Sequence, residues 1–521
     1  MSESVGEFML PVDKDIRDQI LSEEGNIVIS ASAGTGKTYT TVQRIIRDAE
    51  KNKSYQTFAA ITFTRKAAKE IGNRLGPNKG EGFVGTNDNF IWIEIIQPFM
   101  YDVYGKEFKI DIKPDFSDEN QISNFDEGVE KIKDTHLMCK YNNNHKNFAF
   151  QLALSILKNS KAARRFMKAK YYRIYIDEFQ DSDVDMHNFF MYLCDDLEIS
   201  LFIVGDSKQS IYGWRGAYSR GFIGLFTKET FKLFNLWHNF RSNKVIQNYS
   251  NIFMKSVRKH YQDTEFNDEV IVYKSRNNSE VVEYIRQWID VNKKCAFLNF
   301  SNANAERWSK LLNNTGIPFV YVPGSPLDYA NLESEHIWIA RAVANYLLKH
   351  RYSEYDFRDD IPMPEEYRIN NIKKMLNEIK EEQHNYNVFE ERCTKLYEYL
   401  GYDGNLDKSK NEIRILHEVA NDEKYVPTYN QDHFKLTSGT IHSSKGLEFD
   451  QVIINAQDYD FAGEGIMYLH YVAISRPEER LLIIAQNSFM DRYKGYINTA
   501  ISRTRDLGIE IEAKRVIKII E

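Results

Sequence analysis

The chain has 521 residues, of which 42% are hydrophobic and 27% charged, and its formal net charge is −7. This profile is typical of a globular protein with about two to four domains, and it excludes binding to polyanions by bulk charge alone. No run approaches the roughly 18 apolar residues that a membrane helix needs, and the N-terminal segment lacks the pattern of a secretory signal. Four cysteines without a CxxC pair favour a reducing, cytoplasmic setting.

Short apolar runs recur along the chain and alternate with segments of helical period. The predicted strands are 26–30, 58–63, 173–177, 201–206, 270–274, 295–300, 319–323, 451–456 and 481–486. This alternation favours an α/β fold built on parallel sheets. Two stretches break it: residues 106–160 are polar before a helix, and residues 330–430 have helical spacing. We therefore expect two α/β domains, each interrupted by a mainly helical insertion.

The first predicted strand leads into a glycine-rich turn and a helix, with the sequence SAGTGKT at 32–38. Glycines let backbone N–H groups approach phosphate oxygens, and the helix dipole favours their negative charge. Lys37 would neutralise the β- and γ-phosphates, and Thr38 would ligate Mg²⁺. The alternative is an ordinary glycine-rich turn, and Ala31 replaces the first glycine of the usual pattern. The nucleotide-binding candidates are Ser32, Ala33, Gly34, Thr35, Gly36, Lys37 and Thr38.

The strand at 173–177 ends in a pair of acids, Asp177 and Glu178. An aspartate at a strand end can hold Mg²⁺, and a neighbouring glutamate can orient or deprotonate an attacking water. Such a pair alone is a weak signal, because a solvated turn or a structural carboxylate cap looks the same. Its place behind a strand, together with a phosphate loop, favours the catalytic interpretation.

Further segments complete an ordered set of motifs. They are ITFTRKAAKEI at 61–71, VGDSKQSIYGWRGA at 204–217, NFRS at 239–242, TIHSSKGLEF at 440–449 and YVAISRPEERL at 471–481. With SAGTGKT and IDEFQD they resemble superfamily 1 DNA helicases of the UvrD/Rep/PcrA type, over most of the chain outside the two insertions. The resemblance implies two RecA-like P-loop domains with ATP and Mg²⁺ in the cleft between them. The implied division is 1–105 and 161–262 for domain 1A, 106–160 for insertion 1B, 263–329 and 431–521 for domain 2A, and 330–430 for insertion 2B.

The resemblance also assigns roles at the nucleotide. Gln19 would read adenine, and Phe240 stands where the family usually has a stacking tyrosine. Gln209 would sense the γ-phosphate, which Arg241 and Arg476 would also reach. The implied catalytic set is Glu178, Gln209, Arg241 and Arg476, and Gly446 and Glu448 would contact ribose and phosphate. The alternatives are an exposed glutamine at 19 and surface salt bridges for the two arginines.

The matched motifs also supply DNA contacts, since single-strand binding needs phosphate donors and stacking platforms. The candidates are Thr62, Phe63, Thr64, Arg65, Thr86, Tyr212, Trp214, Arg215 and His442. A basic stretch at 158–173 has Lys161, Arg164, Arg165 and Lys168 on one helical face. It would be a DNA-backbone patch or a solvated helix face, and charge runs favour the second interpretation.

Several departures from the helicase pattern point to a subgroup. GTND replaces the usual GT-aromatic-His near residue 86, SRP at 475–477 replaces Thr-Arg-Ala, and both insertions are short, which argues against processive strand separation by this chain alone. GTNDNFIWIEIIQPF at 85–99 and DSDVDMHNFFMYL at 181–193 resemble the helicase-like subunits of Gabija anti-phage systems. That resemblance implies a separate partner, an ATPase–TOPRIM nuclease of the OLD family, in a hetero-oligomer. It also implies no fused nuclease after Arg476.

Three functions fit these features. We expect a DNA-dependent ATPase that senses DNA ends or single strands and activates the partner nuclease. The alternative within the same class is a stand-alone 3′ to 5′ helicase of repair or replication. A scaffold with a residual nucleotide site is a third possibility, which the full set of phosphate-contacting residues disfavours.

Overall fold

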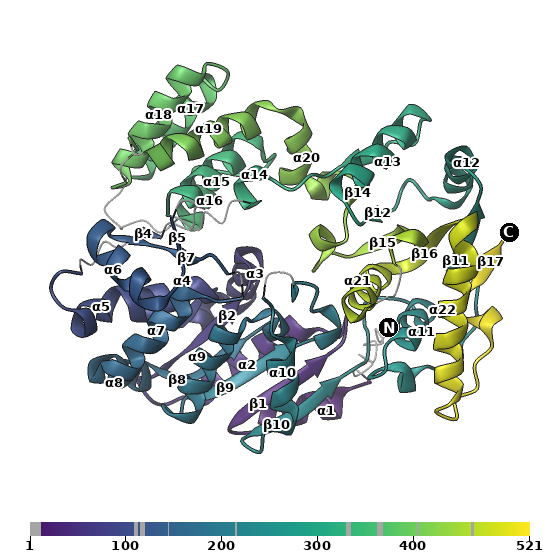
Figure 1. Ribbon diagram of the computed structural model, residues 1–521, viewed down its shortest axis with the longest axis horizontal. Helices are drawn as coiled ribbons and strands as arrows, with labels where there is room; N and C mark the ends of the chain where they lie inside the picture. The colour runs from purple at the N-terminus through teal and green to yellow at the C-terminus, as the bar shows by residue number, and fades with distance from the viewer. Residues whose placement is uncertain are drawn as a thin grey trace, which may run out of the picture.

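The computed structural model describes residues 12–521 apart from 109–112, 115–119, 144, 214–215, 330–334, 362–367, 403, 406 and 460–462. Two parallel sheets flanked by helices stand side by side, and a helical group lies above the first sheet (Figure 1). The expected α/β fold is confirmed. Within the described ranges, none of the helices combines the length and hydropathy of a membrane-spanning segment.

The first sheet has six parallel strands in the order β10-β1-β9-β8-β2-β3. Its strands are β1 (Asn26–Ala31), β2 (Thr57–Thr62), β3 (Phe83–Thr86), β8 (Tyr171–Ile176), β9 (Ser200–Gly205) and β10 (Phe231–Leu236). Its helices are α1 (Lys14–Ser22), α2 (Lys37–Lys51), α3 (Arg65–Leu75), α4 (Asn87–Ile91), α5 (Gln97–Tyr104), α8 (Lys161–Lys170), α9 (Val184–Asp195) and α10 (Ser219–Gly224). Because all strands are parallel, the loops after β1, β8 and β9 emerge at one edge of the sheet.

The second sheet has seven parallel strands in the order β13-β14-β12-β15-β16-β11-β17. Its strands are β11 (Val270–Ser275), β12 (Cys295–Asn299), β13 (Val320–Tyr321), β14 (Leu436–Thr440), β15 (Phe449–Asn455), β16 (Pro477–Gln486) and β17 (Lys518–Ile520). Its helices are α11 (Lys244–Phe253), α12 (Asn278–Trp288), α13 (Asn302–Asn314), α21 (Glu464–Ile474) and α22 (Asn487–Arg505). Val270 and Val272 face a core shared with α11, α21 and α22, whereas Ile271 faces α12 and α13.

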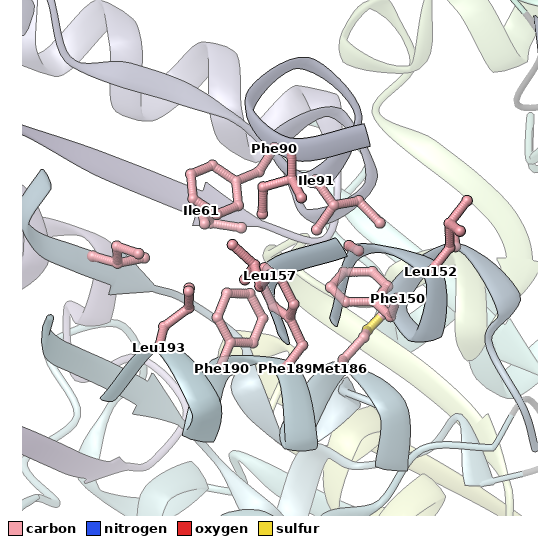
Figure 2. Packing of buried hydrophobic residues seen from close by; sticks show 14 of the residues in the cluster. Ile61, Phe90, Ile91, Phe150, Leu152, Leu157, Met186, Phe189, Phe190 and Leu193 are labelled. Atoms are coloured by element: carbon pink, nitrogen blue, oxygen red, sulfur yellow. The ribbon is translucent and has the colours of Figure 1, made fainter. Parts of the chain in front are cut away.

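Residues 106–160 are joined to the first sheet through a common core. They contain α6 (Phe125–Thr135), α7 (Phe148–Asn159) and two short parallel strand pairs, Lys113–Pro114 with Leu137–Met138 and Gln121–Ile122 with Lys140–Tyr141. Figure 2 shows Phe150 and Leu157 of α7 among Phe189 and Phe190 of α9 and Phe90 of α4. This stretch therefore packs as an extension of the first sheet's hydrophobic layer.

The second insertion has a core of its own. Its helices are α14 (Pro326–Tyr329), α15 (Glu335–Leu348), α16 (Glu354–Asp360), α17 (Ile369–Glu381), α18 (Tyr386–Tyr399), α19 (Asp407–Asn421) and α20 (Val426–Tyr429). The helical spacing seen in the sequence is matched by burial, because Ile372, Leu376 and Ile379 of α17 are fully buried in this core. Lys69 of α3 pairs with Asp360 of α16 at 3.3 Å, which ties the insertion to the first domain.

Candidate nucleotide-binding site

The loop between β1 and α2 forms a tight turn that only glycine fits. Gly34 and Gly36 have φ of 70° and 72°, in the left-handed region that side chains rarely adopt. A Cβ on Gly34 would lie 2.1 Å from Asn239 Oδ1. The N–H of Phe240 donates to the Gly34 carbonyl at 2.9 Å, so the NFRS segment is held directly against the loop. The loop leads into the N-terminus of a 15-residue helix, an arrangement suited to binding an anion.

The two predicted acids lie beside this loop. Lys37 Nζ is 3.0 Å from Glu178 Oε1, and Thr38 Oγ1 donates to Asp177 Oδ2 at 3.3 Å. Glu178 has φ of 56°, a left-handed conformation that costs a non-glycine residue about 1–3 kcal/mol and occurs often at functional sites. The fully buried Gln180 donates to Glu178 Oε2 at 2.5 Å and thereby fixes the carboxylate. The sequence prediction that these groups meet is consistent with this geometry.

The charges of these groups depend on one another. Burial, together with Glu178, raises the pKa of Asp177 to about 6. Burial also acts to raise the pKa of Glu178, but Lys37 and Lys445 outweigh it and hold that pKa at about 2. Burial acts to lower the pKa of Lys37, but neighbouring carboxylates, Glu178 first, outweigh it and the pKa is raised. Lys37 and Glu178 are therefore both charged at neutral pH.

The second domain contributes Arg476 to the same site. Arg476 is 1% exposed, and its Nη2 donates to Gln209 Oε1 at 3.2 Å. Gln209 in turn donates to Asp206 Oδ2 at 2.7 Å, so a chain of hydrogen bonds crosses from one domain to the other. Burial, with Arg241 nearby, lowers the pKa of Arg476 to about 10, which leaves it protonated. Arg241 Nε lies 2.6 Å from Glu448 Oε2, so these two candidates also meet.

Lys445, which sequence reasoning missed, also joins the two domains. Its Nζ pairs with Asp181, donates to the Gln209 carbonyl at 2.9 Å and lies 4.8 Å from the centroid of the Tyr212 ring. The neighbouring Gly446 has φ of 81° and turns the chain between β14 and β15. Its position in TIHSSKGLEF, directly before the candidate Gly446, is the sequence signal that points to it.

Gln19 faces away from the phosphate loop, so the structure does not support its expected contact with adenine. Arg17 and Ile20 are the buried residues of α1, whereas Gln19 is exposed. Residues two positions apart on a helix are rotated by about 200°, so Gln19 and Arg17 lie on opposite faces of α1. Arg17 donates to the Thr35 carbonyl at 2.6 Å and lies 5.2 Å from the Phe240 ring centroid. The residue of α1 that reaches the site is thus an arginine.

The expected DNA contacts are only partly brought together. Thr62 and Thr86 are register partners at the ends of β2 and β3, but Thr62 is 1% exposed, so a direct DNA contact of its side chain is not supported. Thr64 is exposed and caps α3, and Phe63 beside it is half-buried. The rings of Tyr212 and His442 lie 6.1 Å apart across the domain boundary. Trp214, Arg215 and the side chain of Arg65 lie outside the described residues.

Part of the basic stretch at 158–173 makes contacts within the protein. Lys168 pairs with Glu198 at 3.0 Å, and Lys170 pairs with Glu94 at 2.7 Å. Arg164 donates to the last carbonyls of α7, including that of Leu157 at 2.8 Å. These contacts favour the interpretation as a solvated helix face over a DNA-backbone patch.

Comparisons with known proteins agree with this geometry. A sequence profile of the AAA domain family matches residues 16–215. The chain is 37% identical to the Gabija protein GajB of Bacillus cereus (strain VD045) over 510 residues, which cover 97% of this chain and 100% of that protein. It is 23% identical to the ATP-dependent DNA helicase PcrA of Staphylococcus epidermidis over 63% of this chain and 53% of the relative. It is 24% identical to DNA helicase II of Escherichia coli over 58% of this chain and 50% of the relative. The chain thus spans about half the length of the two helicases.

Proposed function

This chain belongs to the GajB family of helicase-type ATP-hydrolysing enzymes, and on that premise we propose that it is a DNA-dependent ATPase of anti-phage defence. In this proposal it senses DNA ends or single strands and activates a partner nuclease of the ATPase–TOPRIM (OLD) type within a hetero-oligomer. The observation that carries the proposal is the contact of Arg476 with Gln209, because it joins groups from both sheets beside one phosphate loop.

Each polar group of the site has a defined chemical role in this proposal. Lys37 and the loop N–H groups bind the β- and γ-phosphates. The Thr38 hydroxyl and the Asp177 carboxylate, 3.3 Å apart, are the hard oxygens that suit Mg²⁺, which when bound would neutralise phosphate charge. Glu178, ionised and held by Gln180, accepts the proton of the attacking water.

The two arginines would stabilise the negative charge that develops during hydrolysis. Arg476 is already directed by its bond to Gln209, and Arg241 is held by Glu448. DNA binding would act on the same groups through Tyr212, because its ring contacts Lys445 and lies near His442 of the second domain. A change at the DNA loops would thereby reach Gln209 and Arg476.

A stand-alone 3′ to 5′ helicase is the second candidate. It draws support from the similarity to PcrA and DNA helicase II. One observation argues against this candidate. Residues 106–160 share the core of the first sheet, so among the described residues one insertion has a separate core. A cytoplasmic setting is part of the proposal and fits the four cysteines, all of which are buried.

The ATPase assignment is tested by steady-state hydrolysis with and without single-stranded DNA. Lys37→Ala and Glu178→Gln are expected to remove the DNA-stimulated rate, because they remove the phosphate cation and the general base. Lys310→Ala is the matched control, since this lysine is 72% exposed and pairs along its own helix with Glu306. Retained turnover in either site variant would contradict the assignment.

The partner is tested by mixing the chain with an ATPase–TOPRIM nuclease and measuring assembly size and DNA cleavage. A large complex whose cleavage depends on Glu178 of this chain supports the defence role. A monomer that separates DNA strands without the nuclease would favour the second candidate.

A further inference from the structure

The guanidinium of Arg17 joins four parts of the nucleotide site. It is 8% exposed, and its Nε and Nη2 donate to the Asp13 carboxylate at 2.8 and 2.9 Å. Nη1 donates to Thr40 Oγ1 of α2, and Nη2 donates to the Thr35 carbonyl at 2.6 Å. Its Cζ lies 5.2 Å from the centroid of the Phe240 ring. One side chain therefore contacts α1, α2, the phosphate loop and the NFRS segment.

The bond to Thr35 determines where the next N–H points. The Thr35 C=O and the Gly36 N–H belong to one planar trans peptide, so they point in opposite directions. Thr35 lies between two glycines, which give this turn conformational freedom because they have no Cβ, and both have positive φ. Because Arg17 holds the carbonyl on the α1 side, the Gly36 N–H is directed away from α1. In a phosphate loop this N–H is one of the donors to the phosphate oxygens.

The charge of Arg17 is already neutralised within the protein. Asp13 is 5% exposed and accepts two hydrogen bonds from the guanidinium, so Arg17 is not placed as a second phosphate cation beside Lys37. The contacts need the planar fork of arginine, which lysine does not have. The same plane supports the Phe240 ring by a cation–π contact. That ring is still 50% exposed and is free to stack on a nucleobase.

We infer that Arg17 is a positioning residue for nucleotide binding, which orients the Gly36 N–H and supports Phe240 without contacting the nucleotide. The inference rests on the proposed ATPase function and explains why α1 presents an arginine at this site. In this role Arg17 differs from a residue whose only function is to dock α1 onto α2.

The test compares Arg17→Lys with a matched control, Arg44→Lys. Arg44 is also buried, pairs with Asp48 four residues away at 2.9 Å and donates to the Ile20 carbonyl of α1. It therefore ties α1 to α2 away from the phosphate loop. Arg17→Lys is expected to raise the KM for ATP and the Kd of ADP about tenfold while kcat stays within about twofold. Arg44→Lys is expected to lower the melting temperature but to leave both constants within about twofold.

A second measurement uses inorganic tripolyphosphate, which has no base, as a competitive inhibitor. Arg17→Lys is expected to weaken tripolyphosphate binding through Gly36, whereas Phe240→Leu is expected to weaken only ADP. The inference is overturned if Arg17→Lys leaves tripolyphosphate binding unchanged, if it lowers kcat instead of raising KM, or if Arg44→Lys reproduces its effect.

Failure of the proposed function is distinguishable from failure of the inference, because ADP binding is measured by calorimetry without turnover. A wild-type chain that binds ADP without hydrolysing ATP would refute the function and leave the comparison of Arg17 with Arg44 intact. A wild-type chain that binds neither ADP nor tripolyphosphate would refute both.

Discussion

Removing Lys445 should weaken the domain interface by an amount that depends on pH. Lys445 and Asp181 are 11% and 4% exposed, so Lys445→Met leaves a buried carboxylate without its cation. Burial raises the pKa of Asp181 to about 6 even with Lys445 opposing it. In the variant, Asp181 can take up a proton instead of remaining charged. The penalty is therefore limited to about 1.4 kcal/mol for each pH unit above 6, or about 3 kcal/mol at pH 8.

The assay is kcat/KM for ATP with saturating single-stranded DNA, measured from pH 6.5 to 8. The ratio of wild type to Lys445→Met is expected to rise with pH, to at most about tenfold at pH 7 and about a hundredfold at pH 8. Adding Asp181→Asn to Lys445→Met should recover part of the loss at pH 8, because the carboxylate that lost its partner is gone. A ratio that does not change with pH, or a double variant as impaired as the single one, would refute this reasoning.

Two further predictions concern the phosphate loop and the core of the second domain. Gly34→Ala is expected to weaken ADP binding at least tenfold, because its Cβ would lie 2.1 Å from Asn239 Oδ1. Gly224→Ala is the control, because a Cβ at that position meets open space. Equal ADP affinities of the two variants would count against the loop geometry. Burial lowers the pKa of His470 to about 3, so as pH falls below about 6.5 only the unfolded state gains this proton and stability drops by about 1.4 kcal/mol per unit. His470→Gln should make the melting temperature depend less steeply on pH between pH 7 and 5, and an unchanged slope would contradict this prediction.

The fold could be predicted where strands are mainly apolar and buried. β1 and β8 are such strands, and their predicted and observed ranges differ by one or two residues. β14 was missed because its sequence, LTSGT, is small and polar although it is buried inside the sheet. Ser438 on this strand is fully buried and donates to the Ala305 carbonyl of α13, a long-range contact that no local pattern shows. The strand predicted at 319–323 is shorter in the structure, where it spans Val320–Tyr321.

The site could be predicted where a motif fixes the backbone locally. Lys37 follows a glycine turn and Glu178 follows a buried strand, so their pairing depends only on parallel strands that end at one edge. Arg17 could not be found this way, since its role comes from tertiary contacts. For Arg17, helical period shows which face of α1 is buried but not that this face meets Thr35.

The most direct test of a nucleotide site shared by two domains is the DNA-stimulated ATP hydrolysis rate of Arg476→Ala relative to wild type. Arg476 comes from the second domain yet contacts Gln209 of the first. An arginine acting on the γ-phosphate is worth about 10³–10⁵ in rate, so the variant should lose at least a hundredfold in kcat while it still binds ADP. Equal rates for the variant and wild type would contradict the account.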